Sequence, residues 1–303
     1  MTPVALIAQE KRRRAVRDAV DAFQKELRAK IGEHSRIFIK PDIQHFDLQL
    51  SSTHPDALRG LLDALRSFTN VPIIIGDASN YGTREAFSRL GFLPIIDEYP
   101  DVSFVDLQEE PVIECEIERA GVMTPVRRAR RLQNCDVTIS LASLKTHADY
   151  GVALSVATFA EGTWIVPPRQ TPHGKQFSRA PWLHAQGDRG MHELLAGLYM
   201  QFPATFAVID GTLGMEGDGP LYGNPVPVGV AIAGLDAVAV DAVAASIMGF
   251  DPQEIGYLRF CAAGGCGIVE MAKIDVPPHL LNDVVRPFAL PPETRQRLTS
   301  WME

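Results

Sequence analysis

Four short apolar runs rich in β-branched residues constrain the fold of this sequence most, because each leads to charged residues. The runs at 36–39, 71–75, 137–141 and 206–209 lead to Lys40-Pro41-Asp42, Gly76-Asp77, Lys145-Thr146-His147 and Asp210-Gly211. Short apolar runs separated by helical segments are typical of buried parallel strands. Ligands of open α/β sheets bind beyond the carboxyl ends of such strands, so we expect these polar residues to share one site.

The segments between the runs have helical patterns, which predicts an α/β fold: a mainly parallel open sheet flanked by helices. Residues 9–31 carry apolar side chains every three or four positions, as an amphipathic helix does. Residues 51–55 supply capping side chains and a first-turn proline for a second helix, which runs to Phe68. Two successive strand–loop–helix units imply parallel strands with right-handed crossovers.

Two regions depart from this alternation. Residues 102–128 alternate in short runs, which indicates an inserted region of antiparallel strands or a hairpin. Residues 161–190 have no period and are expected to form a long loop, either a cationic lid over an anionic ligand or a solvated mobile loop. We expect one domain over 1–303, alternatively with two lobes at about 1–160 and 190–290 that share one cleft, and a peripheral helix at 287–303.

The composition is that of an ordinary globular protein and excludes several classes of function. The 303 residues are 46% hydrophobic, enough for one large core. A net charge of −8 argues against a nucleic-acid surface. No run approaches the roughly 20 apolar residues that span a bilayer, so we expect a cytoplasmic protein without a membrane partner. Four cysteines without Cys-x-x-Cys spacing predict neither a disulfide nor an iron–sulfur cluster.

Lys145 and His147 are the first candidates for catalysis, because residues two apart in an extended strand face the same side. A lysine can clamp an anion or, when desolvated, act as a base, and a histidine can carry a proton. Asp77 and Asp210 end two other strands and are expected to orient these groups or to bind a metal. The alternative for His147 is a buried histidine with a purely structural role.

A second group of residues is expected to hold the substrate. Its members are Lys40, Asp42, Thr53, His54, Ser79, Gly214, Gly217, Gly219, His173 and Lys175. Thr53 and His54 precede a helix N-terminus, which attracts anions, although His54 could equally be a surface residue. The glycines let the backbone approach a ligand, or they serve only a tight turn. Glu216 and Asp218 in the same stretch are candidate ligands of a divalent cation.

Several of these segments, in this order, resemble the uncharacterised bacterial and archaeal family known as domain of unknown function 362. The matching pieces are Ile39-Lys40-Pro41-Asp42, Thr53-His54-Pro55, Ile75-Gly76-Asp77, Leu144-Lys145-Thr146-His147, and residues 210–211, 214–220, 236–241 and 248–252. Some members carry a ferredoxin-like module, which implies redox chemistry, but this chain has no such module. It also has Asp42 where the family pattern usually has Asn, and Ala157-Thr158 where it usually has Lys-Asn.

Three functions follow from these residues. The first is an enzyme that performs acid–base chemistry, with or without a metal, on a small anionic metabolite, such as an isomerisation, cyclisation or elimination. The second is a redox or electron-transfer enzyme, as the iron–sulfur relatives imply. The third is a non-catalytic module that binds a small ligand in the same crevice. The sequence is compatible with a homodimer and does not specify the substrate.

Overall fold

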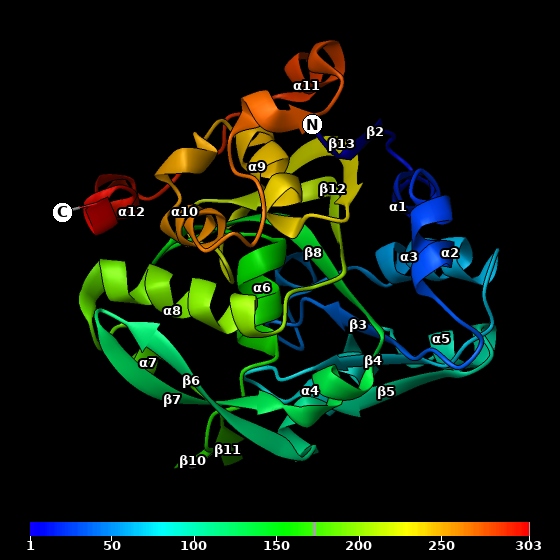
Figure 1. Ribbon diagram of the computed structural model, residues 1–303, viewed down its shortest axis with the longest axis horizontal. Helices are drawn as coiled ribbons and strands as arrows, with labels where there is room; N and C mark the ends of the chain where they lie inside the picture. Colours follow the sequence, from blue (N-terminus) through cyan, green and yellow to red (C-terminus); the bar gives the residue numbers. More distant parts are fainter. Residues whose placement is uncertain (172–173, 303) are drawn as a thin grey trace.

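An eight-stranded sheet forms the centre of the fold in the computed structural model, which describes residues 1–171 and 174–302 (Figure 1). Seven strands follow the order β2 (Ala5–Ala8), β13 (Asn224–Gly234), β12 (Phe206–Glu216), β8 (Val137–His147), β3 (Ile37–Pro41), β4 (Ile73–Asp77) and β5 (Val102–Asp106). The eighth, β9 (Gly151–Ala153), pairs with the end of β8. The strands from β12 to β5 run parallel, and β13 is antiparallel to both neighbours. The expected mainly parallel α/β sheet is confirmed.

The order in which the chain builds the sheet reverses between β3 and β8. Strands β4 and β5 follow β3 toward one edge, whereas β8 and then β12 lie on its other side. The connections on the two sides of such a boundary leave in opposite directions, which opens a crevice at the carboxyl ends of the strands. The sheet therefore favours a ligand site at the ends of β3, β4 and β8.

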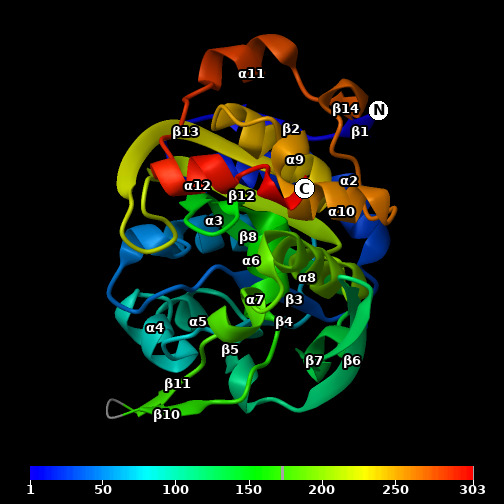
Figure 2. The same ribbon diagram turned by 90° about the vertical axis from the view of Figure 1, so that its left-hand side faces the viewer.

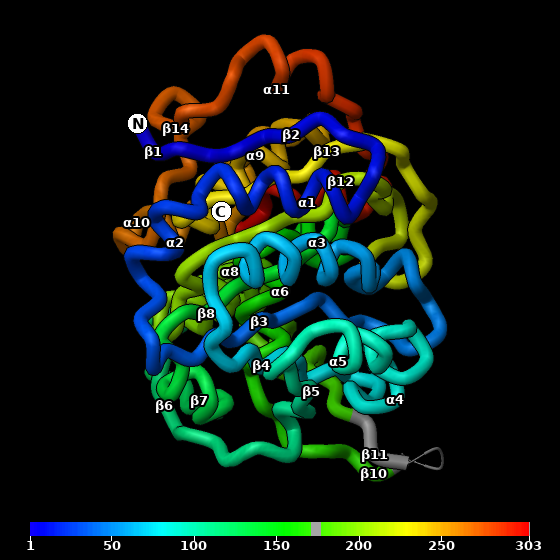
Figure 3. The backbone as a smooth tube through the Cα atoms, turned by 90° about the vertical axis from the view of Figure 1, so that its right-hand side faces the viewer, coloured from blue at the N-terminus to red at the C-terminus, as the bar shows by residue number. Residues whose placement is uncertain are grey.

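One face of the sheet is covered by the helices of the first third of the chain (Figure 3). They are α1 (Arg12–Asp21), α2 (Gln24–Lys30), α3 (Pro55–Arg66), α4 (Thr83–Arg89) and α5 (Ile95–Glu98). Ile37 and Ile39 of β3 point into this layer and are fully buried with the apolar faces of α1 and α3. Each such side chain contributes about 1.5–3 kcal/mol through its removal from water.

The opposite face is covered by later helices (Figure 2). They are α6 (Ser155–Gly162), α8 (Gly187–Gln201), α9 (Ala237–Ile247) and α10 (Gly256–Ala263). Phe38, the residue between the two isoleucines of β3, points into this second core, as expected from the pleat of a strand. The buried carboxylate of Asp241 on α9 accepts hydrogen bonds of 2.9 Å from the N–H groups of Ser155 and Val156, and so holds the start of α6 against the sheet.

Two of the expected regions differ in detail from the structure. The antiparallel hairpin consists of β6 (Val112–Arg119) and β7 (Val122–Ala129), but β5, in the same expected region, joins the main sheet in parallel. Residues 161–190 are not one long loop. They include the short hairpin of β10 (Arg169–Thr171) and β11 (Gly174–Gln176), helix α7 (Ala180–Leu183) and the start of α8. Elements of three or four residues are too short to produce a period in the sequence.

The two ends of the chain also form shorter elements than expected. The helix expected over 9–31 is divided at Ala22 and Phe23, because Phe23 turns into the core and packs edge-on against Phe206, with 5.5 Å between ring centroids. At the other end, α12 (Pro292–Arg297) and one turn of 3-10 helix at 300–302 stand in place of the single helix expected over 287–303, and α11 (Pro278–Val284) precedes them. Strand β1 (Thr2–Pro3) pairs with β14 (Ile274–Asp275). Across the described ranges, none of the helices has the length and apolar character needed to traverse a bilayer.

Candidate functional site

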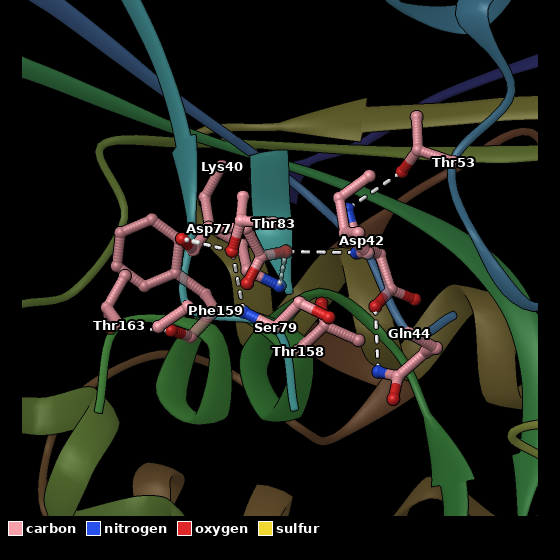
Figure 4. Close-up of polar contacts among 12 residues, drawn as sticks. Lys40, Asp42, Gln44, Thr53, Asp77, Ser79, Thr83, Thr158, Phe159 and Thr163 are labelled. Carbon is pink, nitrogen blue, oxygen red and sulfur yellow. Dashed lines mark hydrogen bonds and ion pairs between the residues drawn. The ribbon is translucent and has the colours of Figure 1, made fainter. Parts of the chain in front are cut away.

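A buried ion pair joins the carboxyl ends of β3 and β4. Nζ of Lys40 lies 3.2 Å from Oδ2 of Asp77, and each side chain is only 2% exposed (Figure 4). The same carboxylate oxygen accepts a hydrogen bond of 2.9 Å from the backbone N–H of Ile43. Because Lys40 follows Ile39 in the strand, the pleat turns its side chain away from α1 and α3 and toward α6. The pair therefore lies between the sheet edge and α6.

Helix α6 can approach this pair because its last residue is a glycine. A Cβ atom at Gly162 would overlap Lys40 and would lie 2.6 Å from Oδ1 of Asp77. The Gly162 carbonyl accepts a hydrogen bond of 2.9 Å from the N–H of Ala78, so the loop after β4 is tied directly to the end of α6. The bare backbone at this position thus forms one wall of the site.

A small polar pocket with a free volume of about 10 Å³ lies beside the ion pair. It is lined by Lys40, Ile43, Gln44, Asp77, Ala78, Ser79, Asn80, Thr158, Glu161, Gly162 and Arg179. The residues come from the ends of β3 and β4, from the last turn of α6 and from the segment before α7. This pocket is the point where the carboxyl edge of the sheet meets the second helical layer, and it gathers two cations and two carboxylates.

The two carboxylates of the pocket are both easier to protonate than in water. Burial raises the pKa of Asp77 to about 6, although Lys40 opposes the shift. Burial also raises the pKa of Glu161, whose Oε1 accepts a hydrogen bond of 2.7 Å from the hydroxyl of Tyr150. A carboxyl group with a pKa near neutrality, as Asp77 has, can both accept and return a proton, which is the property a general acid–base catalyst needs.

Lys145 and Asp42 form a second buried pair, next to the first but outside the pocket lining. Both side chains are fully buried, and Nζ of Lys145 also donates a hydrogen bond of 2.8 Å to the carbonyl of Ser51. Burial lowers the pKa of Lys145, against the attraction of Asp42. Burial alone would raise the pKa of Asp42, but the charges of Lys145 and Lys40 hold it below its usual value. This pair fastens the ends of β3 and β8 together.

His147 is a buried, neutral side chain. Its ring stacks on Tyr150 with 3.6 Å between centroids, and its Nδ1 accepts a hydrogen bond of 3.1 Å from the N–H of Asp149. Burial, with a smaller effect from Lys145, lowers its pKa to about 3. His147 has no place in the pocket lining, and its contacts are those of a structural residue at the end of β8.

Asp210 turns to the other face of the sheet. Its carboxylate forms an ion pair of 2.7 Å with Nε of Arg12 on α1 and accepts a hydrogen bond from the N–H of Thr212. His54, which caps α3 by accepting from the N–H of Asp56, lies on the same side of the sheet. Burial lowers the pKa of His54, and the charge of Arg12 adds to this effect. The structure thus separates these groups from the Lys40–Asp77 pair.

The other expected binding residues have structural partners. The hydroxyl of Thr53 bridges the N–H of Asp42 and the carbonyl of Leu141. Ser79 is buried in the pocket wall, and its hydroxyl accepts from the N–H of Tyr81.

The glycine-rich stretch near residues 214–219 packs against the chain rather than against the pocket. Gly214 faces the ring of Phe288, Gly217 has a positive φ of 79°, and Gly219 lies against the backbone of Thr146.

The candidate metal ligands are not assembled around a common point. The carboxylate of Glu216 accepts a hydrogen bond of 2.8 Å from the N–H of Ala289, in the C-terminal segment. Asp218 follows in the turn after β12 and is exposed. Within residues 1–171 and 174–302, the histidine, cysteine and acidic side chains form no group of three that could hold a metal ion. Any metal held by Glu216 and Asp218 would need further ligands from its substrate or from water.

Among the described basic and histidine side chains of the region expected as a cationic lid, one lines the pocket. His173 lies outside the described residues, and Lys175 lies in β11, where its backbone pairs with Gln170. Among the other basic and histidine residues of this region, Arg189 pairs with Glu193, and His184 lies near Asp149. Arg179 alone is seen in the pocket lining, where it is 97% buried.

Two functional candidates were missed by the sequence analysis as individual residues: Glu161 and Arg179. Glu161 is the one acid in an otherwise small and apolar helix, Ser155–Gly162, which is a usable signal for a buried carboxylate. Arg179 follows a stretch without a period, so nothing local distinguishes it from the other basic residues there. Thr158, at one of the two positions where the chain departs from the family pattern, also lines the pocket.

Comparison with known families shows the family to which the chain belongs. The model of the family described as "Domain of unknown function (DUF362)" matches residues 37–246, more than half of the sequence. The chain belongs to this family. The matched range includes every residue that lines the pocket, from Lys40 to Arg179. The resemblance inferred from the motifs is therefore confirmed.

Two individual proteins are similar to this member of the family. The thylakoid-associated protein sll1697 of Synechocystis sp. is 24% identical over 211 residues, which are 67% of this chain and 59% of that protein. The chain therefore spans about six-tenths of the length of this relative. The lactate racemase apoprotein of Thermoanaerobacterium thermosaccharolyticum aligns in structure with a TM-score of 0.47 and 12% identity, over 85% of this chain and 56% of that one.

Proposed function

We propose that this protein is an enzyme that moves a proton on a small anionic metabolite, in the pocket between the ends of β3 and β4 and the end of α6. The reaction class is isomerisation, cyclisation or elimination. The observation that carries the proposal is the Lys40–Asp77 pair, 3.2 Å apart and 2% exposed on each side chain, in the wall of a pocket. Burying two charges costs several kcal/mol per ion before their attraction is counted, and apolar residues would serve a purely structural wall better.

The two members of the pair suit complementary parts of a proton transfer. With a pKa of about 6, Asp77 is mostly ionised at neutral pH and accepts a proton at little cost. The ammonium group of Lys40 stabilises the negative charge that develops on the substrate when the proton leaves, because the surrounding site is dry and its dipoles are fixed. Glu161, with its raised pKa and its bond to Tyr150, is placed to serve as a second proton donor.

The placement of the catalytic groups therefore shifts from β8 to β3 and β4. Lys145 keeps a part in this proposal as a positioning residue, because Asp42 lies two residues from Lys40 and is held by Lys145. His147, with its contacts to Tyr150 and Asp149, has a structural part only. Asp210, on the far side of the sheet with Arg12, has no part in the proton transfer.

A screen for product formation tests the proposal. The full chain is incubated with defined pools of small carboxylic and hydroxy acids, and mass spectrometry coupled to chiral chromatography detects any new isomer or elimination product. The same pools are given to the variants Asp77→Asn and Lys40→Met. The matched control is Asp63→Asn, which removes a carboxylate paired with Arg13 at 2.6 Å on the opposite helical layer.

We expect product with the wild-type protein and with Asp63→Asn, and a rate at least 100-fold lower with Asp77→Asn and Lys40→Met, since a positioned acid or base contributes about 10²–10⁴-fold. Full activity of Asp77→Asn would contradict the proposal. Binding of a pool member by the wild-type protein with no product from any pool would also contradict it and would indicate a non-catalytic binding module.

A further inference from the structure

Arg179 is a buried cation that forms no ion pair with a carboxylate of the described residues. Its side chain is 97% buried, and none of the carboxylates in residues 1–171 and 174–302 lies within the 4 Å of an ion pair. Its Nη atoms donate to three neutral oxygens: Oδ1 of Asn80 and the carbonyl of Ala78, each at 2.6 Å, and the carbonyl of Trp164 at 2.7 Å. An unmatched buried charge is costly, so a negative group supplied by a ligand would stabilise it.

The guanidinium also retains an unused donor. Nε of Arg179 is buried and has no hydrogen-bond partner in the described part of the chain. Arg179 lines the same pocket as Lys40 and Asp77. Buried polar groups are paired in the great majority of cases. Nε of Arg66, Arg119 and Arg128 is also buried and unpaired, and Arg179 differs from these three because it lines the pocket beside Lys40.

The charges of the pocket select the kind of anion. Lys40 is already paired with Asp77, and Glu161 adds a second acidic group to the wall. A phosphate carries close to two negative charges at neutral pH and would be repelled by these carboxylates. A carboxylate carries one negative charge, and its planar oxygens accept well from a guanidinium N–H. The free volume of the pocket is about 10 Å³, so neighbouring side chains would have to move to admit even a small acid.

The buried arginine Arg128 provides an internal comparison. It is also fully buried, also lacks a carboxylate partner among the described residues, and donates to the carbonyl of Leu198 and the hydroxyl of Thr163 at 2.7 and 2.6 Å. Its Nε also has no hydrogen-bond partner among the described residues. Its surroundings are helix ends in the core, and it lines none of the pocket beside Lys40. Arg128 is therefore a structural arginine of the same type, which makes it the natural control.

We infer that Arg179 determines substrate specificity by binding the carboxylate of a small monocarboxylic acid through its free Nε N–H, beside the Lys40–Asp77 pair. The inference rests on the proposed function only in that both use the same pocket. The remaining carbon skeleton of the acid then lies toward Asp77 and Glu161, the groups that exchange protons with it.

The test measures binding of a simple probe rather than turnover. Propionate is titrated into the full chain and followed by NMR and by calorimetry, with propionamide and inorganic phosphate as comparison probes. The protein variants are Arg179→Lys, which keeps the charge but loses the Nε donor, Arg179→Met, and the control Arg128→Met. In protein labelled with ¹⁵N-arginine, the guanidinium Nε resonance that disappears in Arg179→Lys reports on the site directly.

We expect propionate to bind at least tenfold more tightly than propionamide and phosphate, and to shift the Nε resonance of Arg179. Arg179→Lys and Arg179→Met should weaken propionate binding at least tenfold, and Arg128→Met should leave it unchanged. An unchanged affinity in Arg179→Lys, an unmoved Nε resonance at saturation, or phosphate binding as tight as propionate binding would overturn the inference. If Arg179→Met does not fold, the propionate affinity of Arg179→Lys and the Nε resonance of the wild-type protein still test the inference.

The two proposals can fail separately. If propionate binds through Arg179 but Asp77→Asn keeps full turnover, the proton-transfer proposal fails and the carboxylate site stands. If turnover requires Asp77 but Arg179→Lys changes neither propionate affinity nor the KM of the substrate, the carboxylate site fails and the proton transfer stands.

Discussion

The backbone of Gly162 lies directly against the carboxylate of Asp77: a Cβ atom at this glycine would be 2.6 Å from Oδ1 of Asp77 and would overlap Lys40. This contact joins the last turn of α6 to the ends of β3 and β4, and it decides the shape of the pocket. The carboxyl edge of the sheet can hold its ion pair in a dry wall only because α6 presents no side chain there.

Gly162→Ala adds only one methyl group, but it should lower both the stability of the fold and the turnover. Overpacking in a rigid interior costs about 1–3 kcal/mol, because neighbours must leave their preferred rotamers. We expect that loss of stability in urea unfolding, together with a loss of turnover. The control is Gly32→Ala, where the nearest atom is Ser35 Oγ at 3.8 Å and no such cost is expected. Equal stability and activity of the two variants would show that the contact does not shape the pocket.

The protonation of Asp77 should make stability depend on pH in a particular direction. Its pKa rises from 3.8 to about 6 on folding, so the folded state holds a proton more tightly than the unfolded state between these values. Stability from this group is therefore present at low pH and is lost as pH rises from about 4 through 6. The loss is about 3 kcal/mol.

Comparison with Asp77→Asn isolates this effect, because Asn does not titrate. The free energy of unfolding of the wild-type protein minus that of the variant should fall between pH 4 and pH 7, as measured by urea unfolding at each pH. A difference that is flat over this range, or that rises, would show that Asp77 is not a desolvated carboxylate.

Lys145→Met should destabilise the fold strongly. Removal of one member of a buried ion pair leaves the other charge unpaired, at a cost of about 3–5 kcal/mol. Asp42 would be left fully buried without its cation. Urea unfolding measures this loss, and Lys273→Met, at an exposed pair with Glu270, is the control with almost no expected change. If Lys145→Met instead kept its stability and lost turnover, Lys145 would return to the catalytic role expected from the sequence.

His147 should remain neutral at every pH at which the protein is active. Burial lowers its pKa to about 3, whereas the unfolded state protonates near 6.5. Stability should therefore decrease as pH falls below about 6.5, by up to about 1.4 kcal/mol per pH unit from this residue. His147→Phe, which keeps a ring against Tyr150, should lack that slope. A ¹⁵N NMR titration showing the His147 imidazole protonated near pH 6 would contradict this assignment.

The sheet and the edge that carries the site could be predicted from the sequence, because apolar β-branched runs and their polar ends are local signals. The side of the sheet to which each polar residue turns could not. Both faces of a parallel sheet are covered by helices, so the strands carry no alternation of polar and apolar residues that would reveal the face. Lys40 turns toward α6 and Asp210 toward α1, although both follow the same kind of apolar run. The sequence therefore could not show that they lie on opposite faces of the sheet.

The remaining part of the site depends on contacts between distant segments. Arg179 reaches the pocket because its guanidinium binds the carbonyl of Ala78, 101 residues earlier in the chain. Glu161 reaches it because α6 ends in a glycine that fits against Asp77. Neither contact leaves a pattern in the neighbouring sequence. From the sequence alone, Glu161 is an isolated acid and Arg179 is one basic residue among several.

Hydrogen exchange with solvent tests the central claim, proton transfer by Asp77, most directly. Each acid that binds is incubated with the full chain in D₂O, and mass spectrometry follows deuterium on carbon. We expect deuterium to enter the acid in the presence of wild-type protein and of Asp63→Asn, and at least 100-fold more slowly with Asp77→Asn. Deuterium entering equally fast with Asp77→Asn, or a substrate that is converted without any exchange and without dependence on Asp77, would contradict the account.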